Sequence, residues 1–305
     1  MSDITLIDDS EQSSLVTNGL ARNGELYLKK AGSTNAGSIV VYDSGAWKTF
    51  ANEYAPSFTN AYSVDFDGTN DSVDAVSNPN LDVYSASLWF KTAETNFSLP
   101  IAGFGKNGSR YGGIRFIPVV SGRAIEYNDG VQYIAAGGLS NSDVFDNAWH
   151  HVAIVFVSSG YQTTTGTSST DGKGYKIFID GTRVDTALGS TSHSYSLATT
   201  SSFFAVGKER TSYYTGLIDE VAIFGSSLSD SQITNIYRGE DDGGSGGTNG
   251  VPGDLSTFDS NNGPTLWWRM GDTGSDYGTS TITDAGSGGT NGTLANATFS
   301  TDVPT

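Results

Sequence analysis

Short apolar runs separated by polar turns dominate the pattern along this chain. Tyr62, Val64 and Phe66 alternate with polar residues, so they share one face of a predicted strand. The run 151–157 (HVAIVFV) is nearly all apolar, which predicts a strand buried on both faces. An Asp-Gly pair at 180–181 predicts a hairpin turn. Turn signals recur about every 10 to 20 residues, which favours an antiparallel β-sandwich.

One helix is predicted after these strands. Apolar residues recur with helical spacing between Leu228 and Tyr237. Ser229, with Gln232 three residues later, has the spacing of a capping box. Gly239 suits the end of this helix.

The pattern divides the chain into four parts. Residues 1–57 hold short strand signals and predict a small N-terminal β arm for attachment or oligomerisation. Residues 58–240 carry the strong strand pattern and predict the sandwich. Residues 241–262 have the composition of a flexible linker. Residues 263–305 are too few to hold a core alone, so we expect this C-terminal strand segment to complete the sandwich or to dock on a neighbouring chain.

Composition and charge narrow the classes of function. The 16 basic residues are outnumbered by 33 acidic ones, for a net charge of -17. Duplex nucleic acid is therefore not an expected partner, because phosphate binding needs clustered Lys and Arg. The absence of cysteine excludes disulfides and thiolate metal sites. The first ten residues show no signal peptide, and no apolar run is long enough for a membrane span.

Five stretches in order resemble a laminin-G-like domain of the concanavalin-A-like lectin/glucanase superfamily. The resemblance covers roughly residues 60–240, and it rests on 64–73, 87–92, 149–154, 175–181 and 216–224. It implies an all-β fold, a two-sheet antiparallel jelly-roll sandwich. It also implies a lectin-like domain that binds through its loops.

The tail resembles the strand and loop that usually open such domains, but here they come last. Residues 267–272 (WWRMGD) and 283–294 carry this resemblance. Two explanations stay open. The tail supplies a terminal strand in a permuted arrangement, or it begins a truncated second repeat. Together with the arm, the tail is also similar to bacteriophage proteins whose laminin-G-like domains sit on virions.

Glycoside hydrolysis is disfavoured. The glucanase branch of the superfamily uses a Glu-x-Asp-x-x-Glu strand, with alternate carboxylates as nucleophile and acid. In the nearest match, Leu217 and Ala222 stand where the outer glutamates would be. Asp219 and Glu220 are adjacent, so we expect them to point to opposite faces of the strand. The sequence therefore predicts no enzyme, and a divergent glycoside hydrolase is the weakest hypothesis.

Calcium is a candidate cofactor. Several Asp and Asn residues lie between positions 65 and 74, and Ca²⁺ takes six to eight oxygen ligands. The resemblance adds the Asp of the Ile-Asp-Glu-Val strand, which lies beside the first strand in related folds. Asp67, Asp71 and Asp219 are thus candidate calcium ligands. The alternative is that the first two belong to ordinary turns and the other acids are solvated.

Two loops combine basic and aromatic residues, as sugar sites do. Arg210, Tyr213 and Tyr214 lie in one, and Arg110 and Tyr111 lie in the other. These five residues are candidate carbohydrate-binding residues. The alternative is that one tyrosine of each pair belongs to the core.

We expect a phage virion protein of the fibre, spike or decoration type, with structural or adhesive function. Its lectin-like domain would bind host-surface glycans, its other partners would be virion proteins, and its location would be the virion. A homo-oligomer is expected because a short β arm does not fold alone, and a trimer is the specific expectation. The alternative is a bacterial secreted or cell-surface carbohydrate-binding module.

Overall fold

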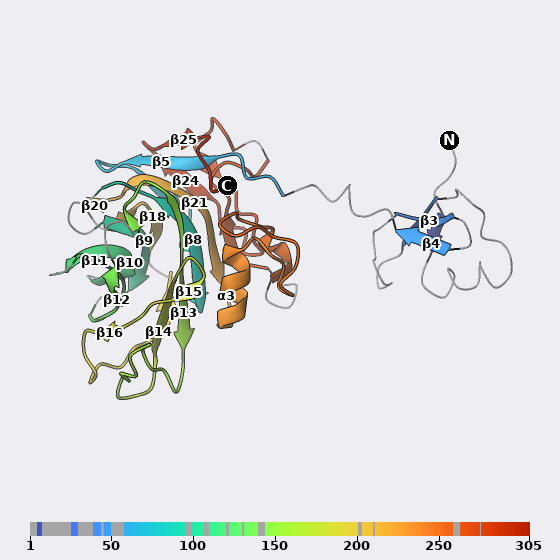
Figure 1. Cartoon of the computed structure of the whole chain (residues 1–305). Coiled ribbons are helices and arrows are strands. Elements are labelled where there is room, and N and C mark those ends of the chain that lie inside the picture. Colours follow the sequence, from blue (N-terminus) through green and yellow to red (C-terminus); the bar gives the residue numbers. More distant parts are fainter. Residues whose placement is uncertain are drawn as a thin grey trace. The chain divides into compact units, whose positions relative to one another are not determined.

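The chain forms two compact units, Met1–Phe58 and Thr59–Thr305, in the computed structural model (Figure 1). In the first unit the structure describes four strands. It also describes Phe58 there, and in the second unit it describes 59–94, 99–106, 110–119, 122–129, 131–139, 144–200, 203–209, 211–258, 263–274 and 276–305. The first unit's strands form one sheet in the order β1 (Thr5–Ile7), β2 (Leu26–Lys29), β3 (Ile39–Asp43) and β4 (Ala46–Thr49).

The second unit is an all-β sandwich of two antiparallel sheets, as the sequence predicts. The nine-stranded sheet contains, in spatial order, β16 (Ala187–Leu188), β12 (Tyr133–Leu139), β11 (Gly122–Asn128), β10 (Arg110–Val119), β9 (Leu99–Lys106), β18 (Phe204–Val206), β6 (Ser72–Ala75), β24 (Gly292–Ala295) and β23 (Thr281–Ile282). The eight-stranded sheet contains β15 (Thr182–Arg183), β14 (Gly174–Ile179), β13 (Trp149–Val157), β8 (Ser85–Lys91), β21 (Thr215–Phe224), β5 (Ser63–Asp67) and β25 (Thr298–Ser300), and β22 (Leu266–Trp268) pairs with β21. Two short two-stranded ladders lie beside them: β7 (Asp82–Val83) pairs with β17 (Ala198–Thr199), and β19 (Lys208–Glu209) pairs with β20 (Ser212–Tyr213).

The core lies between the two sheets and follows the alternation in the sequence. Val64 and Phe66 of β5 are buried there, as the period-two pattern predicts. The inner residues of β13, among them Val152 and Ile154, join the same cluster. Each such side chain contributes about 1.5–3 kcal/mol through its burial. The predicted hairpin is confirmed: β14 pairs with β15, and Asp180 takes φ 49° at the turn.

Helix α3 (Asp230–Tyr237) covers one half of the outer face of the eight-stranded sheet, the face that points away from the other sheet (Figure 1). Its predicted capping box is present: the Ser229 hydroxyl accepts from the Gln232 N–H, and the Gln232 side chain accepts from the Ser229 N–H. The ring of Tyr237 stacks on Trp89, with centroids 5.8 Å apart. Because helix α3 covers the outer face here, β13 is buried on both faces, as predicted. Within the described residues, no helix is long and apolar enough to span a membrane.

The flexible linker expected over 241–262 stays a prediction, although its residues 251–258 pack on the sandwich. Leu255 and Phe258 are buried, and the 3₁₀ helix η1 (Leu255–Thr257) begins at an Asp254 cap. Gly253 packs so closely on Gly239 that an added Cβ would meet its carbonyl oxygen at 2.4 Å. The Gly-rich composition here therefore serves close backbone packing. Residues 259–262 lie outside the described residues.

The tail pairs with strands of its own chain. β24 pairs with β6 in one sheet, and β25 pairs with β5 in the other. β22 adds to β21, and Trp268 is fully buried in the core. The tail thus gives a strand to each sheet, which favours the permuted arrangement over a truncated repeat.

Candidate functional site

The uncovered half of the outer face carries one row of side chains across the eight-stranded sheet. Strand register places Trp149 beside Lys91, Lys91 beside Leu217, and Leu217 beside Asp65. Thr298 of the tail is the next neighbour, opposite Asp65. Facing residues of adjacent strands lie about 4.5–5.5 Å apart, so this row forms a continuous surface.

An open groove of about 700 Å³ lies along the part of this row formed by Lys91, Leu217 and Asp65, and Trp149 and Thr298 stand at its two ends outside the lining. Asp65, Asp67, Glu94 and Asp302 line it, and Lys91 is the basic lining residue among those the structure describes. Apolar side chains in the lining come from Ala93 and Leu217, whereas Phe66 lines the groove but has its ring in the core. Polar lining comes from Thr92, Asn147, Thr215, Gly216 and Ser300. A mixed lining of this kind suits a ligand with both polar and apolar faces.

Gly216 keeps the floor of the groove free of a side chain. Its φ of 130° lies in the region that favours glycine, and an added Cβ would come 2.2 Å from the carbonyl oxygen of Lys91. Next to it, the hydroxyl of Thr92 donates to the carbonyl oxygen of Thr215. These contacts hold the ends of β8 and β21 close together.

Asp302 fixes one wall of the groove. One carboxylate oxygen accepts from Lys91 Nζ at 2.5 Å, and the other accepts from the indole N–H of Trp149 at 2.8 Å. Burial opposes ionisation of Asp302, but its hydrogen bonds with Lys91 and Trp149 outweigh burial and lower its pKa. The anchored carboxylate thereby holds the partly exposed ring of Trp149 beside the groove.

The loop that carries Asn147 is anchored by a histidine. His150 lies 3.1 Å from Asp146 and 2.8 Å from Asp180 through its two ring nitrogens. Burial lowers the pKa of His150, but these carboxylates outweigh it and raise that pKa overall. Asn147 itself takes φ 64° and donates its N–H to the carbonyl oxygen of Thr92.

The structure does not bring the three expected calcium ligands together. Asp67 and Asp71 lie at one turn, where the Asp67 N–H donates to Asp71 Oδ2 at 2.6 Å. Asp219 lies four residues along β21 from Thr215, the partner of Asp67, which is roughly 13 Å away. No three His, Asp or Glu side chains in the described part of the chain are close enough to hold a metal ion. Asp67, Asp71 and Asp219 therefore do not form one site, and calcium binding stays a prediction.

The strands that carry the two expected sugar loops both border β9: β10 pairs with it, and β20 contacts it. Tyr213 lies in β20, which contacts β9, and it is partly exposed. Tyr214 is fully buried and donates its hydroxyl to the carbonyl oxygen of Lys91, so its ring faces the core. Arg110 and Tyr111 lie in β10, but their side chains are outside the described part of the structure. Arg210 is outside it entirely.

Asp219 and Glu220 lie on the same side of β21, contrary to the expected opposite faces. Glu220 takes φ 48° within a bulge, where the pairing with β8 shifts register. Ile218 and Val221 both belong to the core, so the two acids between them are left to the outer side. Burial raises the pKa of Glu220 to about 7, although Arg269 and Trp267 partly offset this effect.

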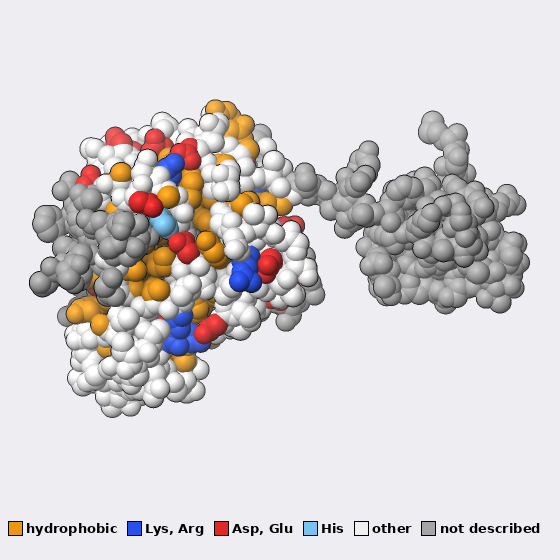
Figure 2. Space-filling model, in the orientation of Figure 1, with side chains coloured by type: hydrophobic (Ala, Val, Ile, Leu, Met, Phe, Trp, Pro, Cys, Tyr) orange, Lys and Arg blue, Asp and Glu red, His pale blue; other side chains and the backbone are white. Residues whose placement is uncertain are grey.

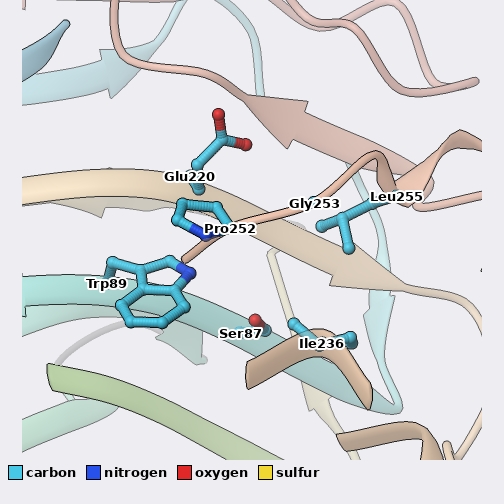
Figure 3. Close-up of a pocket in the computed structure, with 7 residues that line it drawn as sticks. All are labelled: Ser87, Trp89, Glu220, Ile236, Pro252, Gly253 and Leu255. Atoms are coloured by element: carbon cyan, nitrogen blue, oxygen red, sulfur yellow. The ribbon is translucent and has the colours of Figure 1, made fainter. Parts of the chain in front are cut away.

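Glu220 also borders a small space under helix α3, shown in Figure 3. Its other lining residues are Ser87, Trp89, Ile236, Pro252, Gly253 and Leu255. The Glu220 carboxylate points away from Trp89 and Ser87, and the space leaves no room for a water molecule. The space is a packing seam between the sheet and its cover, so the groove is the better ligand site.

Seven of the Lys and Arg side chains that the structure describes in the second unit form ion pairs with acidic residues. Ion pairs join Lys91 to Asp302, Arg115 to Glu126, Lys173 to Asp171, Lys176 to Asp230, Arg183 to Asp185, Lys208 to Asp74 and Arg269 to Glu220. Figure 2 shows the same on one face, where each patch of blue side chains sits beside red ones. The expected absence of a nucleic-acid partner stays a prediction.

Several solved structures are similar to the chain, and the first of them shares its fold. The chain is similar to a candidate carbohydrate binding protein from Bacteroides ovatus ATCC 8483, with 16% identity and a TM-score of 0.51, over 93% of this chain and 71% of that one. A SAP-like pentraxin from Limulus polyphemus has 12% identity and a TM-score of 0.40, over 58% and 82% of the two chains. The CBM40 of the Ruminococcus gnavus IT-sialidase has 13% identity and a TM-score of 0.38, over 59% and 99%. No curated protein sequence matches the chain.

A family comparison identifies the sandwich. The Laminin_G_3 family model, described as the concanavalin A-like lectin/glucanases superfamily, matches residues 67–234, more than half of the chain. This match includes β6 to β21 and most of helix α3. The chain belongs to the concanavalin A-like lectin/glucanases superfamily.

Proposed function

We propose that this protein is a non-catalytic carbohydrate-binding protein and that glycans bind in the groove on the eight-stranded sheet. The groove is the observation that carries the proposal. It is open, about 700 Å³ in size, and it combines carboxylates, amides and hydroxyls with the apolar surface of Leu217. Sugars present polar hydroxyls around an apolar ring face, and such a lining satisfies both. The lectin-type fold supports the same class of ligand.

Trp149 supplies the aromatic surface in this proposal. Asp302 holds its indole N–H, so the ring is oriented before a ligand arrives. An aromatic ring fixed in this way costs little conformational entropy on binding. A sugar ring that lies against Trp149 would place its hydroxyls near Asp302 and Asn147.

Catalysis has weaker support than binding. Asp219 and Glu220 are buried, with Asp219 fully inaccessible, so neither reaches a glycosidic bond. In the groove, Asp67 Oδ1 accepts from the Thr69 N–H, which is a turn contact. We therefore expect no release of reducing sugar from any glycan that binds.

A binding screen followed by titration tests the proposed function. We expect hits on a broad glycan array, and we expect Trp149→Ala to weaken a hit by tenfold or more, about 1.4 kcal/mol. Tyr277→Ala is the matched control, because Tyr277 is an aromatic residue exposed by 52% outside the groove. Tyr213→Ala tests the alternative that glycans bind at the loop of Arg210, Tyr213 and Tyr214 instead of in the groove. Silence across the array, or equal losses in all three variants, would count against the groove.

We further propose, more specifically than carbohydrate binding, that this is a phage virion protein. The resemblance of arm and tail to phage proteins supports it, and in this proposal the separate four-stranded sheet of the first unit would serve as the attachment module. Mass spectrometry of purified particles tests it. Absence of the chain from particles would favour a bacterial secreted or cell-surface carbohydrate-binding module instead.

A further inference from the structure

His150 is almost fully buried and contacts two carboxylates at once. The residue is 9% exposed and lies near the start of β13. Its Nδ1 is 2.8 Å from Oδ2 of Asp180, and its Nε2 is 3.1 Å from Oδ1 of Asp146. A neutral imidazole has one N–H and one acceptor nitrogen, so it can donate to only one carboxylate. Both contacts are therefore hydrogen bonds only when His150 is protonated.

The charges that face His150 come from its own loop and from one turn. Asp146 belongs to the loop before β13, and Asp180 belongs to the turn between β14 and β15. β8 contributes the ring of Phe90, whose centroid lies 5.8 Å from that of His150. Burial lowers the pKa of His150, but the two carboxylates outweigh burial and raise that pKa above 6.5. The ring is therefore protonated at mildly acid pH and loses its proton as pH rises above 6.5.

Deprotonation should release Asp146 rather than Asp180. Asp180 is held a second time, because its Oδ1 accepts from the N–H of His151. Asp146 has the longer contact with the ring and the more exposed side chain, 38% against 31%. Its other hydrogen bond comes from the N–H of Ala148, inside the same loop. That bond moves with the loop, so it does not tie the loop to the sandwich.

The segment that Asp146 anchors forms one side of the groove. Asn147 lines the groove and is exposed there. Its φ of 64° is a left-handed conformation that the surrounding contacts must maintain. Its N–H donates to the carbonyl oxygen of Thr92 at 3.2 Å. Phe145 is packed in the core, so a shift that follows the release of Asp146 is confined to residues 146–148.

We propose that His150 is a positioning residue for the groove, and that its protonated form holds Asn147 in place for glycan binding. This proposal rests on the proposed function of the groove and adds its regulation by pH. Binding is tightest at mildly acid pH, where both carboxylates hold the protonated ring. As pH rises and His150 loses its proton, the loop is released. Binding then weakens about fivefold, the effect of losing one hydrogen bond between Asn147 and a sugar.

Hydrogen exchange at the Asn147 amide tests the positioning role on the full chain without a ligand. Its bond to Thr92 protects this amide, and solvent-exchange NMR gives a protection factor from which the intrinsic pH dependence is removed. We expect the factor to fall about fivefold between about pH 6 and pH 9, with a midpoint above 6.5. His150→Gln should make it independent of pH. Asp146→Asn, at a residue exposed enough to tolerate the change, should move the midpoint to lower pH, because the charge of Asp146 helps to keep the proton on His150.

Two other titratable groups serve as controls. His193→Gln removes a histidine that lies 2.7 Å from Asp129, and neither residue lines the groove. Glu220→Gln removes a buried acid whose pKa of about 7 falls in the same pH range. Both variants should keep the wild-type pH profile of the Asn147 amide. A protection factor that does not change with pH, or that falls as much in His150→Gln as in wild type, overturns the proposal.

Calorimetry tests the regulation with the glycan that gives the strongest array signal. We expect its Kd to rise about fivefold from about pH 6 to pH 8.5 in wild type, and by less than about twofold in His150→Gln. A Kd that is equal at both pH values in wild type overturns the regulation and leaves carbohydrate binding intact. Silence of every glycan overturns the proposed function, while the protection factor of Asn147 still decides whether His150 positions the loop.

Discussion

Glu220 makes the stability of the sandwich depend on pH. Burial raises its pKa from 4.5 to about 7, with Arg269 and Trp267 lowering it in part. The folded state therefore keeps a proton that the unfolded state releases above its own pKa. The resulting contribution to the free energy of unfolding is present at low pH, falls as pH rises from 4.5 to about 7, and is lost above that.

Glu220→Gln should flatten this dependence. Gln keeps an oxygen to accept from Trp267 Nε1, but it does not titrate. We expect wild type to lose up to roughly 3 kcal/mol between pH 5 and pH 8 relative to the variant, measured by urea denaturation. His151 changes the stability in the opposite direction, because burial lowers its pKa to about 4. This effect is the same in both proteins and therefore cancels in the comparison. Parallel pH profiles for the two proteins would show that Glu220 is ionised throughout.

At the scale of elements, the strands and the helix were predictable because their signals are local. Alternation placed Val64 and Phe66, and the capping box of Ser229 and Gln232 marked the start of α3. The bulge at Glu220 was not predictable, because no residue type there announces φ 48°. Its effect was to bring two acids to one side of β21.

The sequence pattern did not predict the groove either, and the physical reason differs from that for the bulge. Its row joins Trp149, Lys91, Leu217 and Asp65, which are far apart in the sequence and meet only through strand register. A lone Trp at the start of a strand resembles a core residue. The clustering of Asp65 and Asp67 was the local signal, but it suggested calcium, and Asp219 lies elsewhere on β21.

The cap of helix α3 allows a test at this scale. Ser229→Ala removes the acceptor for the Gln232 N–H and should lower the free energy of unfolding by about 1 kcal/mol. Ser287→Ala, at an exposed serine outside any helix, should change it by less than about 0.5 kcal/mol. Because α3 covers Trp89, a larger loss at Ser229 would mean that the whole cover detaches. No loss would mean that the cap adds nothing to the folded state.

At the scale of the whole molecule, the order of strands in space matters more than their order in the chain. The tail gives β24 and β25 to the two sheets, and its end returns to the start of the second unit. There the Ser63 hydroxyl donates to the carbonyl oxygen of Asp302 at 2.6 Å, and the Asp272 carboxylate accepts from the Ala61 N–H. Both ends of the unit are therefore tied to the same place.

A circular permutant of the second unit tests this arrangement. Residues 263–305, joined to residues 59–258 by a linker of about six residues, would restore the order that the resemblance implies. We expect the permutant to fold with a melting temperature within about 5 °C of residues 59–305 in native order, because every strand pair is kept. The matched deletion of 263–305 should not fold, since it exposes Val64 and Val73 at the open sheet edges and removes Trp268 from the core. If the deletion folded as well as the permutant, the tail would be an appendage that the two sheets do not need.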